Sequence, residues 1–267
     1  IESKLDLKKR IKGIATVGLE NLNVSPFAGK VDNKLVKKNN KIKILVATHC
    51  FYDSPHVFGK FFFNDMYEWL NYLGKISQKT DYDWYLKLHP NKIFAETNKR
   101  IILHFVNKYK KFKVVEPETS HFSFVGKIDY VLSIHGNISQ EYALFNIPVI
   151  TGRKSNGRFT NYNFNINPKS FQSYNKKLLN LKKNKKIKIN KKEIYAAHFS
   201  NKIYFHQNYI LNFHEYANKV SWKNINGYMA IKYWLENFNE KKHEQIIKNI
   251  SKFIDKSEKQ NKYARLR

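Results

Sequence analysis

Asp83-Trp84-Tyr85-Leu86-Lys87-Leu88-His89-Pro90 carries the clearest structural signal in the sequence. Its first six residues alternate as a β-strand does, and the strand runs directly into a histidine and a proline. Pro90 restricts the backbone of His89 to an extended conformation. Because successive side chains of a strand point to opposite faces, Lys87 and His89 share one face. The stretch therefore predicts a strand that ends in a rigidly held imidazole.

Other short apolar runs have the same form, and helical patterns separate several of them. Apolar residues recur at helical spacing from Phe62 to Ile76 and from Ile101 to Tyr109, and a short helix is expected from Ser139 to Phe145. Strands that alternate with helices predict an α/β fold with a Rossmann-like, doubly wound parallel sheet. The expected strands are residues 42–47, 83–88, 112–115, 130–134 and 147–150.

Composition and pattern divide the chain into four segments. Residues 1–40 are a basic lead-in segment that we expect to pack on the core, and residues 41–175 form the Rossmann-like domain. Residues 176–255 are a basic linker and a helical appendage, in which Met229 is expected in the core. Residues 256–267 are a frayed basic tail. A chain of 267 residues is long enough to bury a sizeable core.

The chain is strongly basic. Lysine and arginine total 49 against 21 acidic residues, a formal charge of +28. Such a field attracts nucleic acid, anionic membrane surfaces or anionic ligands, and it does not choose among them. Cys50 is the one cysteine, which excludes a disulfide framework. No apolar run reaches the roughly 18 residues of a membrane span, and no signal peptide is visible.

Ligands of doubly wound sheets bind outside the carboxyl ends of the strands. Lys87 and His89 lie at such an end, where an imidazole can donate a hydrogen bond to a phosphate oxygen and an ammonium can add charge. The alternative is a surface histidine before a turn proline, which is the commoner outcome for so short a motif. The loops to examine are 48–55, 89–93, 116–121, 135–141 and 151–160.

Ser133-Ile134-His135-Gly136-Asn137-Ile138-Ser139-Gln140-Glu141 is the second candidate segment. Asn137 and Gln140 have the spacing of a capping box. Gly136 allows close backbone approach, and the N–H groups of the helix start suit an anion. Glu141 can accept hydrogen bonds from ribose hydroxyls, or it only stabilises the helix start.

A polar loop after the first strand contains His49 and Asp53, and either is a candidate general base unless the loop is merely solvated. The ten histidines show no metal-ligand spacing, so no metal site is predicted. There is also no GxGxxG and no Walker A sequence, which argues against a standard NAD or ATP site.

The two candidate segments occur in one order on successive units of one sheet. This arrangement resembles the donor-binding domain of GT-B-fold glycosyltransferases of bacterial capsule and surface polysaccharide synthesis, including Kdo- and sialic-acid-transferring enzymes. The resemblance covers roughly residues 40–170. It rests on His89-Pro90, on the turn and helix start with Ser133, His135, Gly136, Ser139 and Glu141, and on Ile147-Pro148-Val149-Ile150.

The resemblance implies metal-independent transfer of a sugar from a nucleotide-activated donor to a growing bacterial surface polysaccharide. The nucleotide-sugar is then a substrate, and no cofactor is expected. The implied partners are this donor, a glycan or lipid-linked glycan acceptor and an anionic membrane surface. The implied location is the cytoplasm, at the inner face of the cytoplasmic membrane. Together with the local patterns, the candidate catalytic residues are His89, Asp53 and His49, and the candidate donor-binding residues are Lys87, His89, Pro90, Ser133, His135, Gly136, Asn137, Ser139 and Glu141.

Two features depart from the family pattern. Members commonly have two Rossmann-like domains, whereas one is evident here, and His135 and Asn137 stand where small residues are usual. Three other functions stay open: a nucleic-acid-binding module, a non-catalytic scaffold of a polysaccharide assembly complex, and a transferase of glycerol phosphate from a CDP-activated donor.

Overall fold

The computed structural model describes residues 1–16, 25–51, 61–90, 95–134, 136–153, 162–183, 189–203 and 228–241, with scattered positions from 243 to 255. Contacts divide the chain into two units, Ile1–Asn201 and Lys202–Arg267. The predicted site lies in the first unit, but Asp53 and His135 fall outside the described residues.

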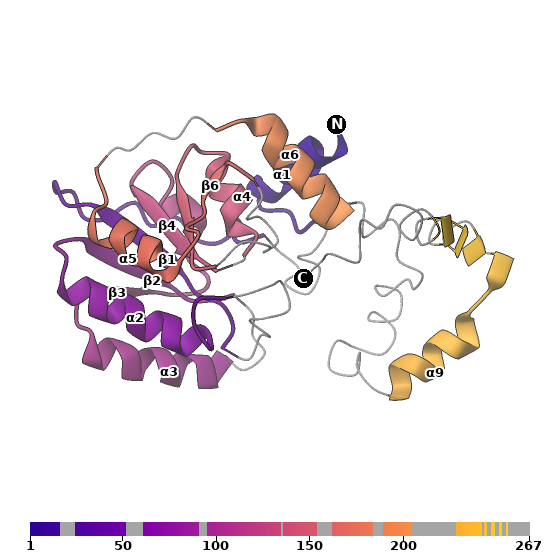
Figure 1. Cartoon of the computed structure of the whole chain (residues 1–267), viewed down its shortest axis with the longest axis horizontal. Helices are drawn as coiled ribbons and strands as arrows, with labels where there is room; N and C mark the ends of the chain where they lie inside the picture. The colour runs from indigo at the N-terminus through magenta and orange to yellow at the C-terminus, as the bar shows by residue number, and fades with distance from the viewer. Residues whose placement is uncertain are drawn as a thin grey trace. The chain divides into compact units, whose positions relative to one another are not determined.

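Six parallel strands form one sheet in the first unit (Figure 1). Their order is β3-β2-β1-β4-β5-β6, and all five neighbouring pairs run parallel. This order is that of the Rossmann fold, so the predicted α/β class with a doubly wound parallel sheet is confirmed. The strands are β1 (Lys43–Ala47), β2 (Asp83–Lys87), β3 (Phe112–Val115), β4 (Tyr130–Ser133), β5 (Val149–Thr151) and β6 (Asn165–Ile166).

The helices of this unit begin at local sequence signals. Asp65 starts one of them, because its carboxylate accepts a hydrogen bond from the Glu68 N–H at 2.7 Å. Ser170 starts another through a capping box with Ser173. The helices are α1 (Glu2–Ile11), α2 (Met66–Gln78), α3 (Ala95–Lys108), η2 (His121–Ser123), α4 (Ile138–Ala143), α5 (Phe171–Leu179), α6 (Lys191–His198) and the π-helical turn η3 (Phe199–Ile203).

Both faces of the sheet are buried, as the continuous apolar strands predict. On one face, Val46 and Leu132 belong to a cluster that takes in buried residues of α2, α3 and α5. On the other face, Leu45 and Val131 pack with Tyr142 of α4. The sheet is therefore held from both sides, and its strand ends occupy fixed positions.

The end of the predicted central domain differs from the observed elements. The predicted boundary at residue 175 falls inside α5, whose Tyr174 and Leu178 are buried in the core. The strand β6 was not predicted either, because two residues give no periodicity to read. The unit continues to Asn201.

The lead-in segment packs on the core at two places. Leu7 of α1 joins Ala143, Ile194 and Ala197 of α4 and α6 in a buried cluster. The turn at 25–29 lies against the loop after β3, where a Cβ on Gly29 would stand 1.9 Å from the carbonyl oxygen of Glu118. Only glycine permits this approach, which brings the turn at 25–29 to the carboxyl edge of the sheet.

The second unit contains α9 (Tyr228–Asn237). Met229, which was expected in a core, is 52% exposed, so that expectation is wrong for this residue. Its helical spacing was correct, but spacing alone does not show whether an apolar face has a partner. Among the described helices, none combines the length and the apolar character that a bilayer crossing requires.

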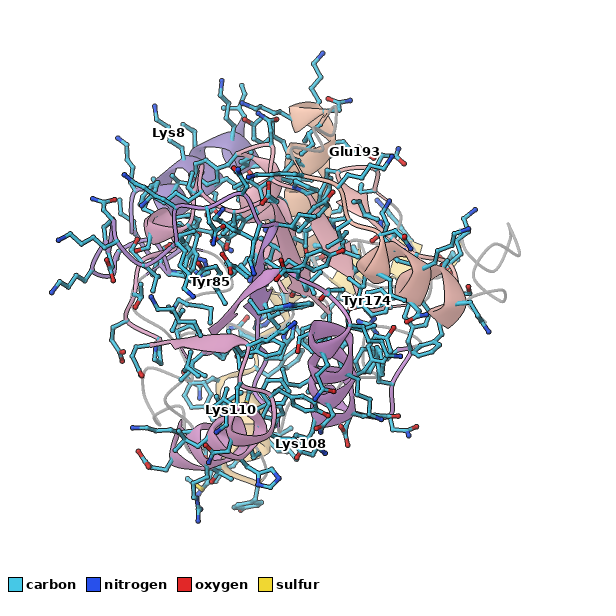
Figure 2. The ribbon with its side chains drawn as sticks, turned by 90° about the vertical axis from the view of Figure 1, so that its left-hand side faces the viewer. Lys8, Tyr85, Lys108, Lys110, Tyr174 and Glu193 are labelled. Carbon is cyan, nitrogen blue, oxygen red and sulfur yellow. The ribbon has the colours of Figure 1, made fainter. Side chains whose placement is uncertain are left out.

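Many lysines of the first unit lie on its surface. Figure 2 shows the side chains of Lys8, Lys108 and Lys110 reaching outward from their helices and loop, whereas Tyr85 and Tyr174 lie inside. A lysine buried within the sheet is therefore an exception that calls for a physical reason.

Candidate functional site

The strand order reverses between β1 and β4, and a ligand crevice is expected at the carboxyl edge of that point. A pocket of about 100 Å³ lies there. His49, which follows β1, and Ser133, which ends β4, meet across it with 3.2 Å between the imidazole Nε2 and the hydroxyl Oγ. The predicted site residues that line this pocket are His49, Lys87, His89, Pro90, Ser133, Gly136, Asn137 and Glu141.

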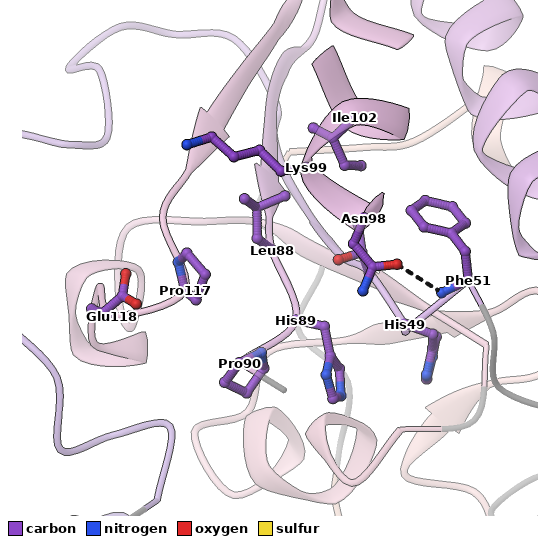
Figure 3. A pocket seen from close by; sticks show the side chains of 11 residues that line it. His49, Phe51, Leu88, His89, Pro90, Asn98, Lys99, Ile102, Pro117 and Glu118 are labelled. Carbon is purple, nitrogen blue, oxygen red and sulfur yellow. Dashed lines mark hydrogen bonds between the residues drawn. The ribbon is translucent and has the colours of Figure 1, made fainter. Parts of the chain in front are cut away.

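His89 also lines a second, adjoining pocket of about 80 Å³ that extends toward α3 (Figure 3). There the imidazole lies between Pro90 and His49, and Asn98 accepts a hydrogen bond from the Phe51 N–H. Burial, with the nearby Lys87 ammonium, lowers the pKa of His89 to about 4. The ring is therefore neutral at pH 7 and carries a proton on one of its two nitrogens.

Lys87 is one of two buried lysines in the described part of the sheet, with 3% of its surface exposed against 7% for Lys43. Its ammonium donates hydrogen bonds to the carbonyl oxygens of Glu116 at 2.8 Å and Pro117 at 2.7 Å. Burial lowers its pKa to about 8, against the opposing effect of the Glu118 and Glu116 carboxylates. An ammonium has three donors, so one N–H stays available beside the pocket.

His49 is a candidate general base whose Nε2 faces two donors. The Ile134 N–H points at Nε2 from 3.4 Å, and the Ser133 hydroxyl lies 3.2 Å away. A nitrogen that accepts from a backbone N–H carries no proton, so the ring has its proton on Nδ1. This geometry suits donation from Nδ1 better than proton abstraction by Nε2.

The predicted capping box at the start of α4 is wrong. Asn137 occupies the N-cap position, but its backbone is already helical and its side chain makes no capping hydrogen bond. The Gln140 amide instead lies 3.0 Å from His198 Nδ1 on α6. The Ser139 N–H and hydroxyl both bond the carbonyl oxygen of Gly136, so Ser139 stabilises the turn and does not line the pocket.

Glu141 is held by a residue that the sequence analysis missed. Arg10 of α1 donates to Glu141 Oε1 at 3.1 Å, with side-chain exposures of 0% and 3%, and its Nε bonds Thr16. No described residue bonds the other carboxylate oxygen, and Glu141 lines the pocket. A separation of 131 residues hides this pair from any local sequence pattern.

His121 is a second missed residue of this pocket. It lies in the loop after β3, one of the strand-end loops where a ligand contact was expected. Its Nδ1 is 2.9 Å from the Tyr142 hydroxyl, and burial with the nearby Lys87 lowers its pKa to about 3. Among the described residues, no group of three His, Cys, Asp or Glu is placed to hold a metal ion.

No protein-family profile matches the sequence, and no curated protein matches it. Among solved structures, the chain is similar to Thermosulfurimonas dismutans KpsC, a beta Kdo 2,4 transferase (12% identity, TM-score 0.42, 74% of this chain and 54% of that one). It is also similar to Methanocaldococcus jannaschii UDP-GlcNAc 2-epimerase in complex with UDP-GlcNAc and UDP (18% identity, TM-score 0.37, 73% of this chain and 50% of that one). A third similar structure is a glycosyltransferase from Rickettsia africae (12% identity, TM-score 0.34, 61% of this chain and 44% of that one).

The chain spans about half the length of these structures. At such identities the likenesses concern the fold alone. Strand order and pocket together define the class of this protein: a Rossmann-like α/β protein with a lysine- and histidine-lined pocket at the switch point of its sheet.

Proposed function

We propose that the chain is the donor-binding part of a glycosyltransferase, and that the pocket at the switch point binds the phosphate groups of a nucleotide-activated sugar. The observation that carries the proposal is the convergence of Lys87, His89 and Ser133 on one pocket from two strands. The sequence pattern predicts phosphate contacts for Lys87 and His89, and the motif order resembles that of GT-B donor domains.

The chemistry of the pocket suits a phosphate leaving group. Lys87 supplies one positive charge, and His89 supplies a neutral N–H beside it. Donors fixed in a partly dry site stabilise charge that develops on the leaving phosphate, which allows transfer without a metal ion. The oxygen of Glu141 that Arg10 does not engage is placed to accept from a ribose hydroxyl.

Equilibrium binding of CMP-, CDP-, UDP- and GDP-sugars tests the proposal, with release of free nucleotide followed in parallel. We expect one class to bind, and His89→Ala to weaken binding at least tenfold and to slow turnover. His104→Ala, which removes an exposed histidine from α3, is the matched control. Equal affinity in wild type and His89→Ala would refute the assignment.

The excess of 49 basic over 21 acidic residues supports a nucleic-acid-binding module as the second candidate. Oligonucleotide affinity that falls steeply with salt, together with indifference to nucleotide-sugars, would favour it. A third result, nucleotide binding without release or transfer, would indicate a non-catalytic relative or a part that needs an acceptor domain.

A further inference from the structure

His121 lines the pocket but belongs to neither of the two candidate segments. It is 5% exposed, and its position is fixed by hydrogen bonds from its own N–H to the Pro26 carbonyl and from the hydroxyl of Ser120 to the Phe27 carbonyl. Loop and lead-in segment thus hold the ring rigidly at the carboxyl edge of the sheet.

The Tyr142 hydroxyl determines which ring nitrogen of His121 carries the proton. Tyr142 is fully buried, and within the described residues its hydroxyl has one hydrogen-bonding partner, His121 Nδ1, at 2.9 Å. A buried phenol needs an acceptor for its proton, so the hydroxyl donates and Nδ1 accepts. The ring proton is then on Nε2.

The Nε2–H of His121 has no acceptor among the residues that the structure describes. The ring lines the pocket together with His89 and Lys87. The Lys87 ammonium donates two hydrogen bonds to backbone carbonyls, and its third N–H likewise has no acceptor among the described residues. A donor of a pocket-lining ring that has no protein acceptor can give its hydrogen bond to an oxyanion in the pocket.

We propose that His121 is a binding residue for a phosphate oxygen, that it donates from Nε2 as a neutral imidazole, and that Tyr142 is the positioning residue that fixes this tautomer. The proposal rests on the proposed function and extends it: the phosphate subsite is built from the ends of β2 and β3. Lys87 supplies the positive charge of this subsite, and His89 and His121 supply directed hydrogen bonds to the phosphate oxygens.

Two substitutions of His121 separate the pocket contact from the contact with Tyr142. Glutamine carries its amide near the position of Nε2, and asparagine carries it near that of Nδ1. We expect His121→Asn to weaken binding of pyrophosphate and of the nucleotide diphosphates UDP and CDP about tenfold, and His121→Gln to stay within about threefold. Urea unfolding checks that both variants fold.

Tyr142→Phe tests the positioning role. It keeps the packing but releases Nδ1, so we expect a weakening of about threefold and a mixture of tautomers. Tyr85→Phe is the matched control, because its buried hydroxyl serves the Lys37 N–H outside the pocket. Long-range proton–nitrogen NMR of the ring reads the tautomer directly: Nε2–H in wild type and in Tyr85→Phe, mixed in Tyr142→Phe.

The outcomes distinguish this inference from the proposed function. If His89→Ala weakens pyrophosphate binding and His121→Asn does not, the role of His121 is wrong and the pocket assignment stands. If neither substitution changes it, the pocket assignment itself fails. Two results on the wild-type protein alone would also overturn the inference. One is an NMR spectrum that shows the proton of His121 on Nδ1. The other is a His121 Nε2 chemical shift that does not change when pyrophosphate is added in moderate salt.

Discussion

The carboxyl ends of β2 and β4 carry similar polar side chains, but they use them differently. At the end of β2, Lys87 donates two of its three N–H groups to carbonyl oxygens of the neighbouring loop, and the third is left beside the pocket. After β4, Ser139 bonds Gly136, and Gln140 contacts His198. The first end presents donors to the pocket, whereas Ser139 and Gln140 of the second end stabilise the fold.

This difference teaches that residue type and position do not suffice to assign a ligand contact. A polar side chain can bind a ligand only through donors and acceptors that are not already hydrogen-bonded within the protein. Glu141 shows the intermediate case, because one carboxylate oxygen bonds Arg10 and the other is left at the pocket. We therefore expect substitutions at the β4 end to affect mainly stability, and those at the β2 end mainly binding.

Arg10→Met should have the largest effect, because it leaves the Glu141 carboxylate buried without its partner. We expect a loss of about 3–5 kcal/mol in the free energy of unfolding. The double variant Arg10→Met/Glu141→Leu should recover most of it, and the exposed neighbour Lys9→Met should cost about 0.5 kcal/mol or less. Urea denaturation measures all three; equal losses in the single and double variants would show that the pair is not coupled.

Gly29→Ala should displace the loop after β3, which supports Lys87 at the end of β2. A Cβ would stand 1.9 Å from the Glu118 carbonyl oxygen, so the loop must move. We expect a loss of about 3 kcal/mol and weaker nucleotide binding, since this loop holds Lys87 and His121. Gly126→Ala, which meets no atom within 4 Å but has a positive φ, should cost about 1 kcal/mol. Similar losses at both glycines would contradict the close approach.

Raising the pH should weaken phosphate binding at the β2 end. The pKa of Lys87 is lowered to about 8, so its ammonium is charged at pH 7 and largely neutral at pH 9. We expect affinity for pyrophosphate to fall about tenfold over this interval. In Lys87→Met the affinity should be low and show no inflection near pH 8. An inflection that persists in this variant would assign the charge to another group.

Glu141→Gln should have the smallest effect on nucleotide affinity, although it also removes the negative charge beside the buried Arg10 and so lowers the free energy of unfolding. The amide oxygen can still accept from Arg10, while the pocket loses one carboxylate oxygen. We expect ribonucleotide affinity to fall about threefold to tenfold, and affinity for the matching 2′-deoxyribonucleotide to change little. Glu96→Gln, an exposed acid in the first turn of α3, is the control. Equal losses of affinity for the ribonucleotide and the 2′-deoxyribonucleotide would show that Glu141 does not contact the ribose 2′-hydroxyl.

Sequence patterns predicted the sheet and the edge of the site well, because apolar strands and strand-end prolines are local signals. They placed Lys87 and His89 in the pocket and failed on the capping box after Gly136. Gln140 of that box contacts His198 instead, and Glu141 beside it bonds Arg10; both partners come from helices far away in the sequence. Such long-range partners, and the proton position that Tyr142 sets, have no periodicity to read.

The most direct test of the β2-end pocket is a thermal-shift screen of CMP, CDP, UDP and GDP at fixed salt, with wild type and His89→Ala compared. A ligand that binds only the folded state raises the melting temperature. The account predicts that at least one nucleotide stabilises the wild-type protein and that His89→Ala abolishes most of this shift. Negligible shifts for all four, or a shift that His89→Ala retains in full, would contradict it.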